Sequence, residues 1–232
     1  RHPIFQMIYR ALHVAVIPLV IVGIVLSTLH QSSLGALFLI MPHRVHPLWY
    51  SPWIPLLFFV SAIAAGLMAL VLEGFLVERW FSSPLKFDLL ERLGKVAAFA
   101  LALYLALRLG DLWVRGTLPA ALDGSWQSLL FGAEVLIGGF LPLALLGSRK
   151  IRQTREGLLT SALLIVAGVV SQRMSLSLFT MWRPVSYLPS LAEVLIAFGI
   201  PAAAALIYLF CAENLVVLDE KAPPETSGYQ IP

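Results

Sequence analysis

Charged side chains are scarce in this chain: only 12% of its 232 residues are Asp, Glu, Lys or Arg, whereas 59% are hydrophobic and the mean hydropathy is +0.86. A soluble domain carries about 25% charged residues. The composition therefore excludes an ordinary soluble fold and indicates an integral membrane protein. The net charge of +3 does not indicate nucleic-acid binding, because the basic residues lie in short stretches between apolar runs, where they signal membrane topology.

Cysteine is almost absent as well. The single Cys211 lies inside an apolar run, which excludes an internal disulfide and an iron–sulfur cluster held only by cysteines of this chain. The chain begins at Arg1, without a methionine, inside a basic lead-in to an apolar run. We therefore expect that N-terminal residues precede it.

Long apolar runs are what the chain does contain, and six of them reach the length of about 20 residues that a spanning helix needs. They cover residues 12–29, 53–77, 93–114, 126–147, 158–179 and 188–217. We expect an all-α fold, a polytopic transmembrane helix bundle over residues 1–218. A polar tail at residues 219–232 should be extended or disordered.

Lys and Arg are distributed unevenly between the two sides of this predicted bundle. Eleven lie at the N-terminus, between the second and third spans, between the fourth and fifth, or after the sixth, and only four lie at the other side. By the positive-inside rule the basic side is cytoplasmic, so both ends of the chain are expected inside. The opposite side also holds most of the tryptophans, as an interfacial belt would.

Polar groups within the spans gather toward the side that is poor in Lys and Arg. An ionisable residue inside a span costs about 2.5 to 3.5 kcal/mol, so it usually faces a partner or a water-filled cavity. Arg108, Asp111 and Arg115 share one helical stripe, where Asp111 can pair with either arginine. Glu134 has no partner on its own helix, and Arg173 or Arg108 could supply one. Structural ion pairs that join helices are the alternative to a functional site.

Three of the five histidines lie close together after the first span: His30, His43 and His46. They fit a polar interfacial loop in which His30 and the following residues cap the helix end, or a site that handles protons or electrons. A metal site is not expected, since no carboxylate or cysteine lies nearby in the sequence. A di-haem site is not expected either, because only His13 and His30 lie on or at the end of a span, and both belong to the same one.

Several of these stretches together resemble the polysulfide-reductase/NrfD-type integral membrane subunits, and most closely the HybB-like membrane subunit of periplasm-facing nickel–iron hydrogenases. The stretches are residues 27–35, 45–49, 73–74, 107–112 and 133–136. Members of that branch have about ten spans, so the six predicted here would correspond to the last six. Asp111 departs from the pattern, in which Glu is expected.

The resemblance implies a quinone-reactive anchor subunit of a respiratory redox complex in the bacterial cytoplasmic (inner) membrane, without catalysis by itself. It implies no covalently bound cofactor and no metal. Menaquinone or ubiquinone is the implied substrate, reached from a periplasmic four-cluster iron–sulfur protein and a catalytic oxidoreductase subunit, such as that of a hydrogenase. The quinone and proton-relay residues would be His30, His46, Arg108, Asp111, Glu134 and Arg173. Partner docking on the periplasmic face would use His43, Arg44, Trp49 and Arg183.

Three other interpretations of the function are compatible with the sequence. The catalytic partner could be another periplasmic oxidoreductase or a multihaem cytochrome complex rather than a hydrogenase. A non-redox transporter could use the same outer cavity, although alternating access needs polar residues near the midplane on both sides. A purely structural anchor would use the ion pairs only to hold helices together, and quinone analogues would not bind to it.

Overall fold

The structure is a computed structural model that describes residues 3–81, 85–179 and 190–214, with side chains described at 15–80, 85–177 and 190–210. Within these residues six helices are long and apolar enough to cross a membrane, which confirms the predicted all-α polytopic bundle. They are Ala15–Leu39, Ile54–Trp80, Phe87–Val114, Trp126–Gly147, Arg155–Ser177 and Leu191–Phe210. The predicted tail at residues 219–232, Arg183 and the side chain of His13 lie outside the described part.

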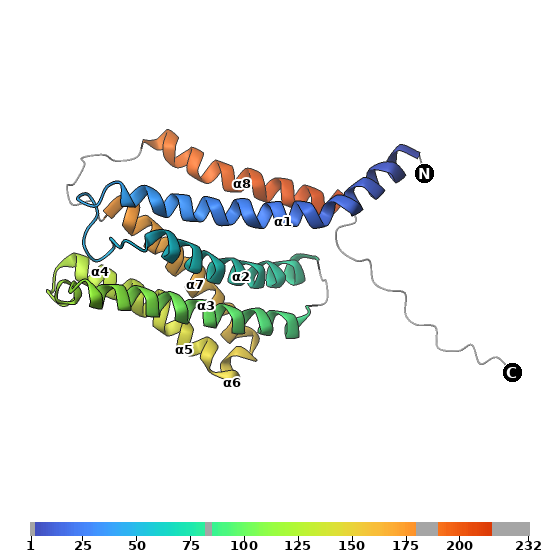
Figure 1. Ribbon diagram of the computed structural model, residues 1–232. Helices are drawn as coiled ribbons and strands as arrows, with labels where there is room; N and C mark the ends of the chain where they lie inside the picture. The colour runs from blue at the N-terminus through green and yellow to red at the C-terminus, as the bar shows by residue number, and fades with distance from the viewer. Residues whose placement is uncertain (1–2, 82–84, 180–189, 215–232) are drawn as a thin grey trace. The chain divides into compact units, whose positions relative to one another are not determined.

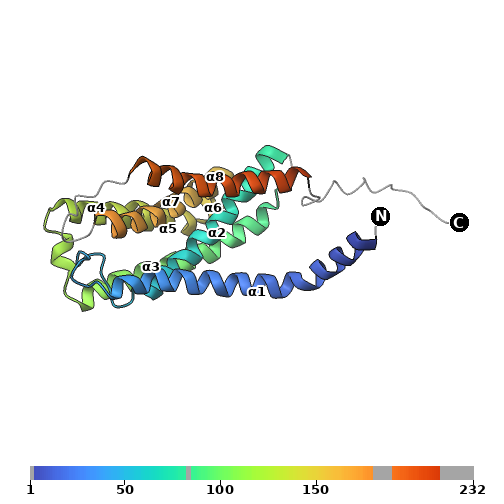
Figure 2. The same ribbon diagram turned by 90° about the horizontal axis from the view of Figure 1, so that it is seen from above.

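The chain divides into two compact units, residues 1–184 and 185–232. Figures 1 and 2 show the first unit as a bundle of long helices that run back and forth. Its elements are α1 (Pro3–Leu39), α2 (Ile54–Phe81), α3 (Phe87–Val114), the short 3-10 turn η1 (Leu118–Ala121), α4 (Trp126–Val135), the π-helical turn η2 (Leu136–Phe140), α5 (Leu141–Gly147), α6 (Arg149–Arg152), α7 (Arg155–Met174) and the π-helical turn η3 (Ser175–Phe179).

The first helix ends ten residues beyond the predicted end of the first span, which was expected at residue 29. It continues to Leu39, so His30 and the polar residues after it lie inside the helix and do not cap its end. Ser33 Oγ donates to the carbonyl of Leu29 at 2.6 Å, so this serine satisfies its hydroxyl within the helix. Gly35 lets α1 approach α2 closely, because a Cβ there would lie 2.8 Å from Cα of Pro55.

The fourth span changes its helical winding at its centre. The π-helical turn η2 lies directly before α5, whose second residue is Pro142. In a regular α-helix the proline ring would clash with the carbonyl four residues earlier, that of Gly138. Single π-turns of this kind are frequent at functional sites, and η2 begins two residues after Glu134.

Two apolar clusters hold the first unit together. The larger lies in the middle of the bundle, where Met68 of α2, Leu101 of α3 and Ile165 of α7 are buried. The smaller includes Leu48 and Trp49 from the loop between α1 and α2, packed with residues of α2, α3, α4 and η3. This second cluster fixes the loop onto the end of the bundle, so that it can carry a side chain into the interior.

The second unit contains α8 (Leu191–Asn214). Its start is a capping box: Ser190 N–H donates to Glu193 Oε2 at 2.7 Å, and Glu193 N–H donates to Ser190 Oγ at 3.3 Å. Glu193 therefore contributes to the cap of this helix.

Candidate functional site

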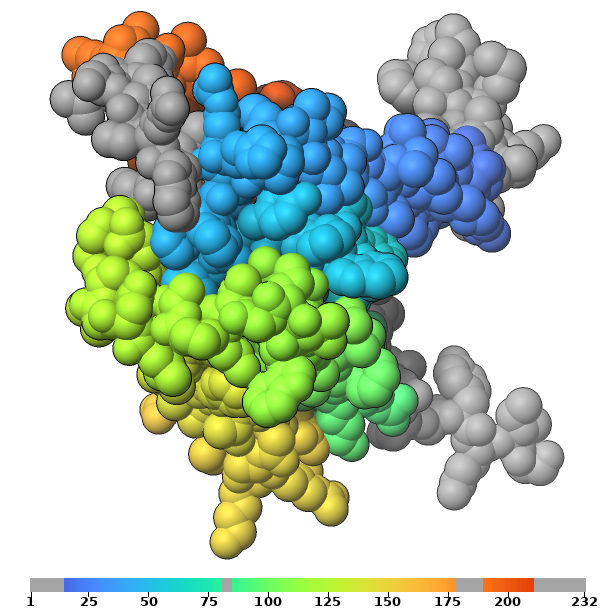
Figure 3. Space-filling view, turned by 60° about the vertical axis from the view of Figure 1, so that its left-hand side comes forward, coloured from blue at the N-terminus to red at the C-terminus, as the bar shows by residue number. Residues whose placement is uncertain are grey.

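The candidate site lies where the α1–α2 loop meets the α3–α4 connection. Figure 3 shows the surfaces of these two segments in direct contact, in blue and green. A hydrogen bond ties them together, since Arg115 Nη1 donates to the carbonyl of Pro47 at 3.1 Å. Among the described helices, α1 and α3 end here and α2 and α4 begin here.

Trp49 reaches from the loop into the bundle. It is 3% exposed, and its indole Nε1 donates to Glu134 Oε2 at 3.0 Å. Its ring meets Phe131 edge-on at a centroid distance of 5.6 Å and His46 at 5.7 Å. The sequence suggested Trp49 as a docking residue on the surface; the structure puts it inside the unit, as the hydrogen-bond partner of a predicted site residue.

Arg108 is the most deeply buried charged residue among those predicted for the site, with 4% exposure. Its Nη1 donates to the hydroxyl of Tyr104 at 2.6 Å, one turn earlier on α3. Its guanidinium lies 4.9 Å from the ring centroid of Phe131. Nε and Nη2 have no hydrogen-bond partner among the described residues. A buried cation with two unpartnered donors is costly, because burial removes its water without replacing it.

Glu134 and Arg108 both line one small cavity. It has a volume of about 20 Å³ and is lined by both side chains, Tyr104 and Gln172, with a glycine wall on one side. Oε1 of Glu134 is buried and has no partner among the described residues. A water molecule needs roughly 10 to 15 Å³ and two to four polar partners. The cavity therefore has the size and the polar lining for one water, but not for a ring-sized ligand.

The glycine wall of this cavity is a close helix contact. A Cβ on Gly168 of α7 would lie 2.5 Å from Cα of Gly138 in η2, and a Cβ on Gly139 would lie 2.8 Å from the Leu105 side chain. Only glycine permits these approaches, which are typical of helix packing in membranes. The contact keeps α7 close enough to η2 for Gln172 to reach the cavity.

Arg173 is bound to α2 and not to Glu134. Its Nη2 donates to Ser61 Oγ at 2.8 Å and to the carbonyl of Phe58 at 3.1 Å, and its Nη1 donates to Gln172 Oε1 at 2.9 Å. Its guanidinium lies over the Phe58 ring. The sequence suggested Arg173 or Arg108 as the ion-pair partner of Glu134; among the described residues neither forms that pair.

Asp111 pairs with Arg115, one of the two arginines expected for it, at 2.8 Å from Nε to Oδ2. Because Arg115 also holds the carbonyl of Pro47, this pair fastens the α1–α2 loop to α3. Asp111 does not line the cavity with Arg108. The environment of Asp111 fits the alternative named above, an ion pair with a structural role.

The three clustered histidines have separate environments. His30 is exposed on α1, and His43 is exposed in the loop. His46 is partly buried; its Nδ1 accepts from Leu48 N–H at 3.3 Å, and burial lowers its pKa below the usual 6.5, partly opposed by the charge of Asp123. In the described part of the chain no three His, Cys, Asp or Glu side chains come together as a metal site would require.

A second cavity lies beside the stretch that carries His30. This groove of about 390 Å³ between α1 and α2 is lined by Ser27, Thr28 and Gln31 and by apolar residues that include Phe59. Arg44, predicted for docking, is exposed in the loop. Arg183, predicted for the same role, lies outside the described residues.

Sequence reasoning missed several residues that complete the site: Tyr104, Phe131, Ser61 and Gly168. Helical spacing carried the signal for two of them, because Tyr104 precedes Arg108 by four residues and Phe131 precedes Glu134 by three. Ser61 and Gly168 meet their partners across helices that are distant in sequence, so no local pattern could have indicated them.

Comparison with known proteins adds a family and three relatives. Residues 2–181 match the family model described as "Polysulphide reductase, NrfD". The chain is 35% identical over 219 residues to a protein of Nitratidesulfovibrio vulgaris, covering 87% of this chain and 54% of the relative. It is 32% identical to the "Probable Ni/Fe-hydrogenase 2 b-type cytochrome subunit" of Escherichia coli, covering 86% and 52%.

A third relative, at 26% identity, is the "Menaquinone reductase, integral membrane subunit" of Nitratidesulfovibrio vulgaris, with 87% of this chain and 54% of the relative covered. This chain spans about half the length of these curated relatives. No solved structure matches it. The resemblance inferred from the sequence is confirmed, and with six candidate spans the chain is a multi-pass membrane protein.

Proposed function

The chain belongs to the NrfD family of polysulphide reductase membrane subunits, and on that premise we propose that it is a quinone-reactive membrane anchor subunit of a respiratory redox complex. It passes electrons between an iron–sulfur partner and menaquinone or ubiquinone and performs no catalysis by itself. Two relatives support this function, one described as a hydrogenase cytochrome subunit and the other as a menaquinone reductase membrane subunit. A nickel–iron hydrogenase is the catalytic partner we favour.

One observation supports the proposal: buried polar atoms that have no hydrogen-bond partner in the described part of the chain surround a water-sized cavity inside an apolar bundle. Arg108 Nε and Nη2 and Glu134 Oε1 are all in this state, and the cavity between them holds about 20 Å³. Such groups are expensive in a membrane protein and usually mark an ion or proton pathway. Reduction of a quinone consumes two electrons and two protons, so a quinone-reactive subunit needs a proton route through its apolar interior.

The sizes of the two cavities suggest a division of roles. The cavity at Glu134 is too small for a quinone ring, so we assign Glu134 and Arg108 to proton transfer through a water. The groove of about 390 Å³ on α1 and α2 has the size of a ligand site, with an apolar wall and a few polar groups. There Gln31 and Thr28 would orient the headgroup.

Helix α2 connects the groove with the buried site. Phe59 lines the groove, while its neighbours Phe58 and Ser61 bind Arg173. Arg173 in turn holds Gln172, which lines the small cavity. These contacts join the small cavity to the stretch of α2 that also lines the groove.

The partner subunit is proposed to dock at the same end of the unit. His43 and Arg44 are exposed in the α1–α2 loop, and the loop is fixed to the bundle by Arg115. By the positive-inside rule this end faces the periplasm. An iron–sulfur protein seated there would bring its terminal cluster to the side of the membrane at which the groove and the buried carboxyl lie.

The test is quinone reduction by the intact complex carrying Glu134→Gln. The amide oxygen of glutamine can still accept the indole N–H of Trp49, but the side chain no longer takes up a proton, so we expect a rate loss of about 10²-fold. Arg108→Gln should also slow the reaction. Glu73→Gln serves as the control, because it changes an exposed carboxyl on α2 that does not line the cavity at Glu134. If both site variants reduce quinone at the parental rate, the site assignment is wrong.

A purely structural anchor is the competing function, and the Asp111–Arg115 pair favours it, since it fastens a loop. This account predicts that site variants lose stability or assembly, while quinone analogues bind neither the parent nor any variant. Saturable binding of a quinone analogue to the parent complex, and its loss in a Thr28→Trp variant that fills the groove, would exclude this function.

A further inference from the structure

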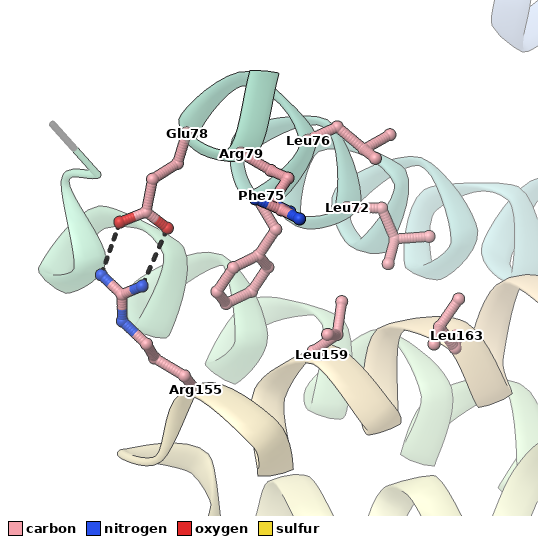
Figure 4. Close-up of a pocket in the computed structure, with 8 residues that line it drawn as sticks. All are labelled: Leu72, Phe75, Leu76, Glu78, Arg79, Arg155, Leu159 and Leu163. Carbon is pink, nitrogen blue, oxygen red and sulfur yellow. Dashed lines mark hydrogen bonds and ion pairs between the residues drawn. The ribbon is translucent and has the colours of Figure 1, made fainter. Parts of the chain in front are cut away.

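A second open groove lies at the opposite end of the first unit, between the end of α2 and the start of α7. It encloses about 670 Å³, within the range of 300 to 1,000 Å³ that ligand sites occupy. Figure 4 shows its floor and walls, formed by Leu72, Phe75 and Leu76 from α2 and by Leu159 and Leu163 from α7. Leu76 and Leu163 are 46% and 53% exposed, so this apolar surface is open to the outside of the unit.

The groove is charged at one end only. Glu78, Arg79 and Arg155 lie at its rim, and the leucines extend inward from them. Seven residues separate Leu72 from Arg79, which corresponds to roughly 10 Å along the helix axis. The exposed Trp80, next to Arg79, is a residue typical of the membrane interface. The groove therefore begins at the interface and runs about 10 Å into the hydrocarbon region.

The charge at the rim is positive because Glu78, the one carboxylate among the described residues that line the groove, is already paired. Glu78 accepts both guanidinium nitrogens of Arg155, at 2.6 and 2.9 Å, as the dashed lines in Figure 4 show. Arg79 lies at the same rim, and none of the described residues gives it a hydrogen bond or an ion pair. One guanidinium at the mouth of an apolar groove thus remains available to an anion.

We propose that this groove binds an anionic phospholipid, with an acyl chain between α2 and α7 and the phosphate on Arg79. The apolar interior of the groove fits the acyl chain of this lipid, and the guanidinium at its rim fits the phosphate. The leucine-lined interior excludes a polar solute, and the unpaired guanidinium favours a negative headgroup over a zwitterionic one. Arg155 is held in place by Glu78, where its remaining hydrogen-bonding edge can reach the same headgroup.

The experiment measures lipid retained by the purified full-length protein, in its native complex, by native mass spectrometry in a mild detergent. Phosphatidylglycerol and phosphatidylethanolamine with identical acyl chains are added in parallel. The parent should bind phosphatidylglycerol more tightly, and Arg79→Gln should weaken that binding about fivefold, the effect of one basic residue near a membrane surface. Binding of phosphatidylethanolamine should change little. Arg92→Gln, an exposed arginine of α3 outside the groove, is the matched control.

A second variant tests the acyl chain independently of the charge. Leu163→Trp fills the groove from an exposed position and leaves Arg79 unchanged, so it should reduce retention of both lipids. Glycerophosphoglycerol, which has the headgroup without chains, should not bind the parent measurably.

Three results would overturn the proposal. The first is equal affinity of the parent for the two lipids, and the second is unchanged phosphatidylglycerol binding by Arg79→Gln. The third is that a Leu163→Cys variant crosslinks to another protein segment in the complex instead of to a photoactivatable lipid.

Discussion

Replacing Trp49 with phenylalanine removes one hydrogen bond and leaves most of the ring packing. The indole N–H to Glu134 Oε2, 3.0 Å long, is lost, while a phenyl ring can still meet Phe131. Because Glu134 Oε1 has no partner among the described residues, the substitution leaves the carboxyl without any hydrogen bond there. A hydrogen bond to a charged group contributes about 1.5 to 3 kcal/mol, so we expect a loss of about 2 kcal/mol in the free energy of unfolding.

A double-mutant cycle isolates this bond from the change in ring size. Glu134→Met removes the acceptor while keeping an unbranched side chain of similar length, and Trp49→Phe is then repeated in that background. The free energy of unfolding is measured in mixed micelles for all four proteins. The cost of Trp49→Phe should fall to well under 1 kcal/mol when the acceptor is absent. An equal cost in both backgrounds would refute the claim that this hydrogen bond holds the loop to α4.

The other predictions concern packing, pH and orientation. Gly168→Ala should lower the free energy of unfolding by about 1 to 3 kcal/mol, because the new Cβ overlaps the facing glycine. Gly66→Ala should leave it unchanged, because the space around Gly66 is open. Equal thermal stability of the two variants would contradict the close contact. The lowered pKa of His46 means that the unfolded chain binds a proton more readily than the folded one, so stability should be full above about pH 6.5 and decline as the pH falls below it. His46→Gln should reduce this decline in a comparison of unfolding at pH 7.5 and pH 5. A cysteine at His43 should react with an impermeant thiol reagent added to the periplasmic side, and a cysteine at Arg92 should not; the reverse pattern would invert the proposed orientation.

The number and location of the spans follow from the sequence because the bilayer imposes a minimum apolar length. Helix ends do not follow in the same way. Residues 30–33 are polar, which indicates where the apolar run stops, yet α1 continues to Leu39 because Ser33 bonds inside the helix. Hydropathy therefore indicates which residues lie within the membrane. The helix itself ends at the first residues that cannot adopt the helical conformation, here just before Pro42.

The candidate site was predictable in composition but not in its contacts. Depth along each helix indicated that Arg108 and Glu134 belong to the same half of the bundle, and both line one cavity. Their partners depend on the rotation of each helix and on the path of a loop, which only long-range packing determines. Trp49 illustrates the limit: a tryptophan near an interface resembles a surface anchor, and the cluster of Leu48, Ile54 and Phe131 turns it inward.

The central claim is that quinone reduction depends on proton transfer through the buried site at Glu134 and Arg108 of this subunit. It is tested most directly by measuring two rates in one preparation of the intact complex carrying Glu134→Gln: reduction of quinone, and reduction of a soluble artificial acceptor that takes electrons from the partner subunits. We expect the rate of quinone reduction to be about 10²-fold below that of the parent, and the rate of artificial-acceptor reduction to be unchanged. A quinone rate equal to that of the parent would contradict it.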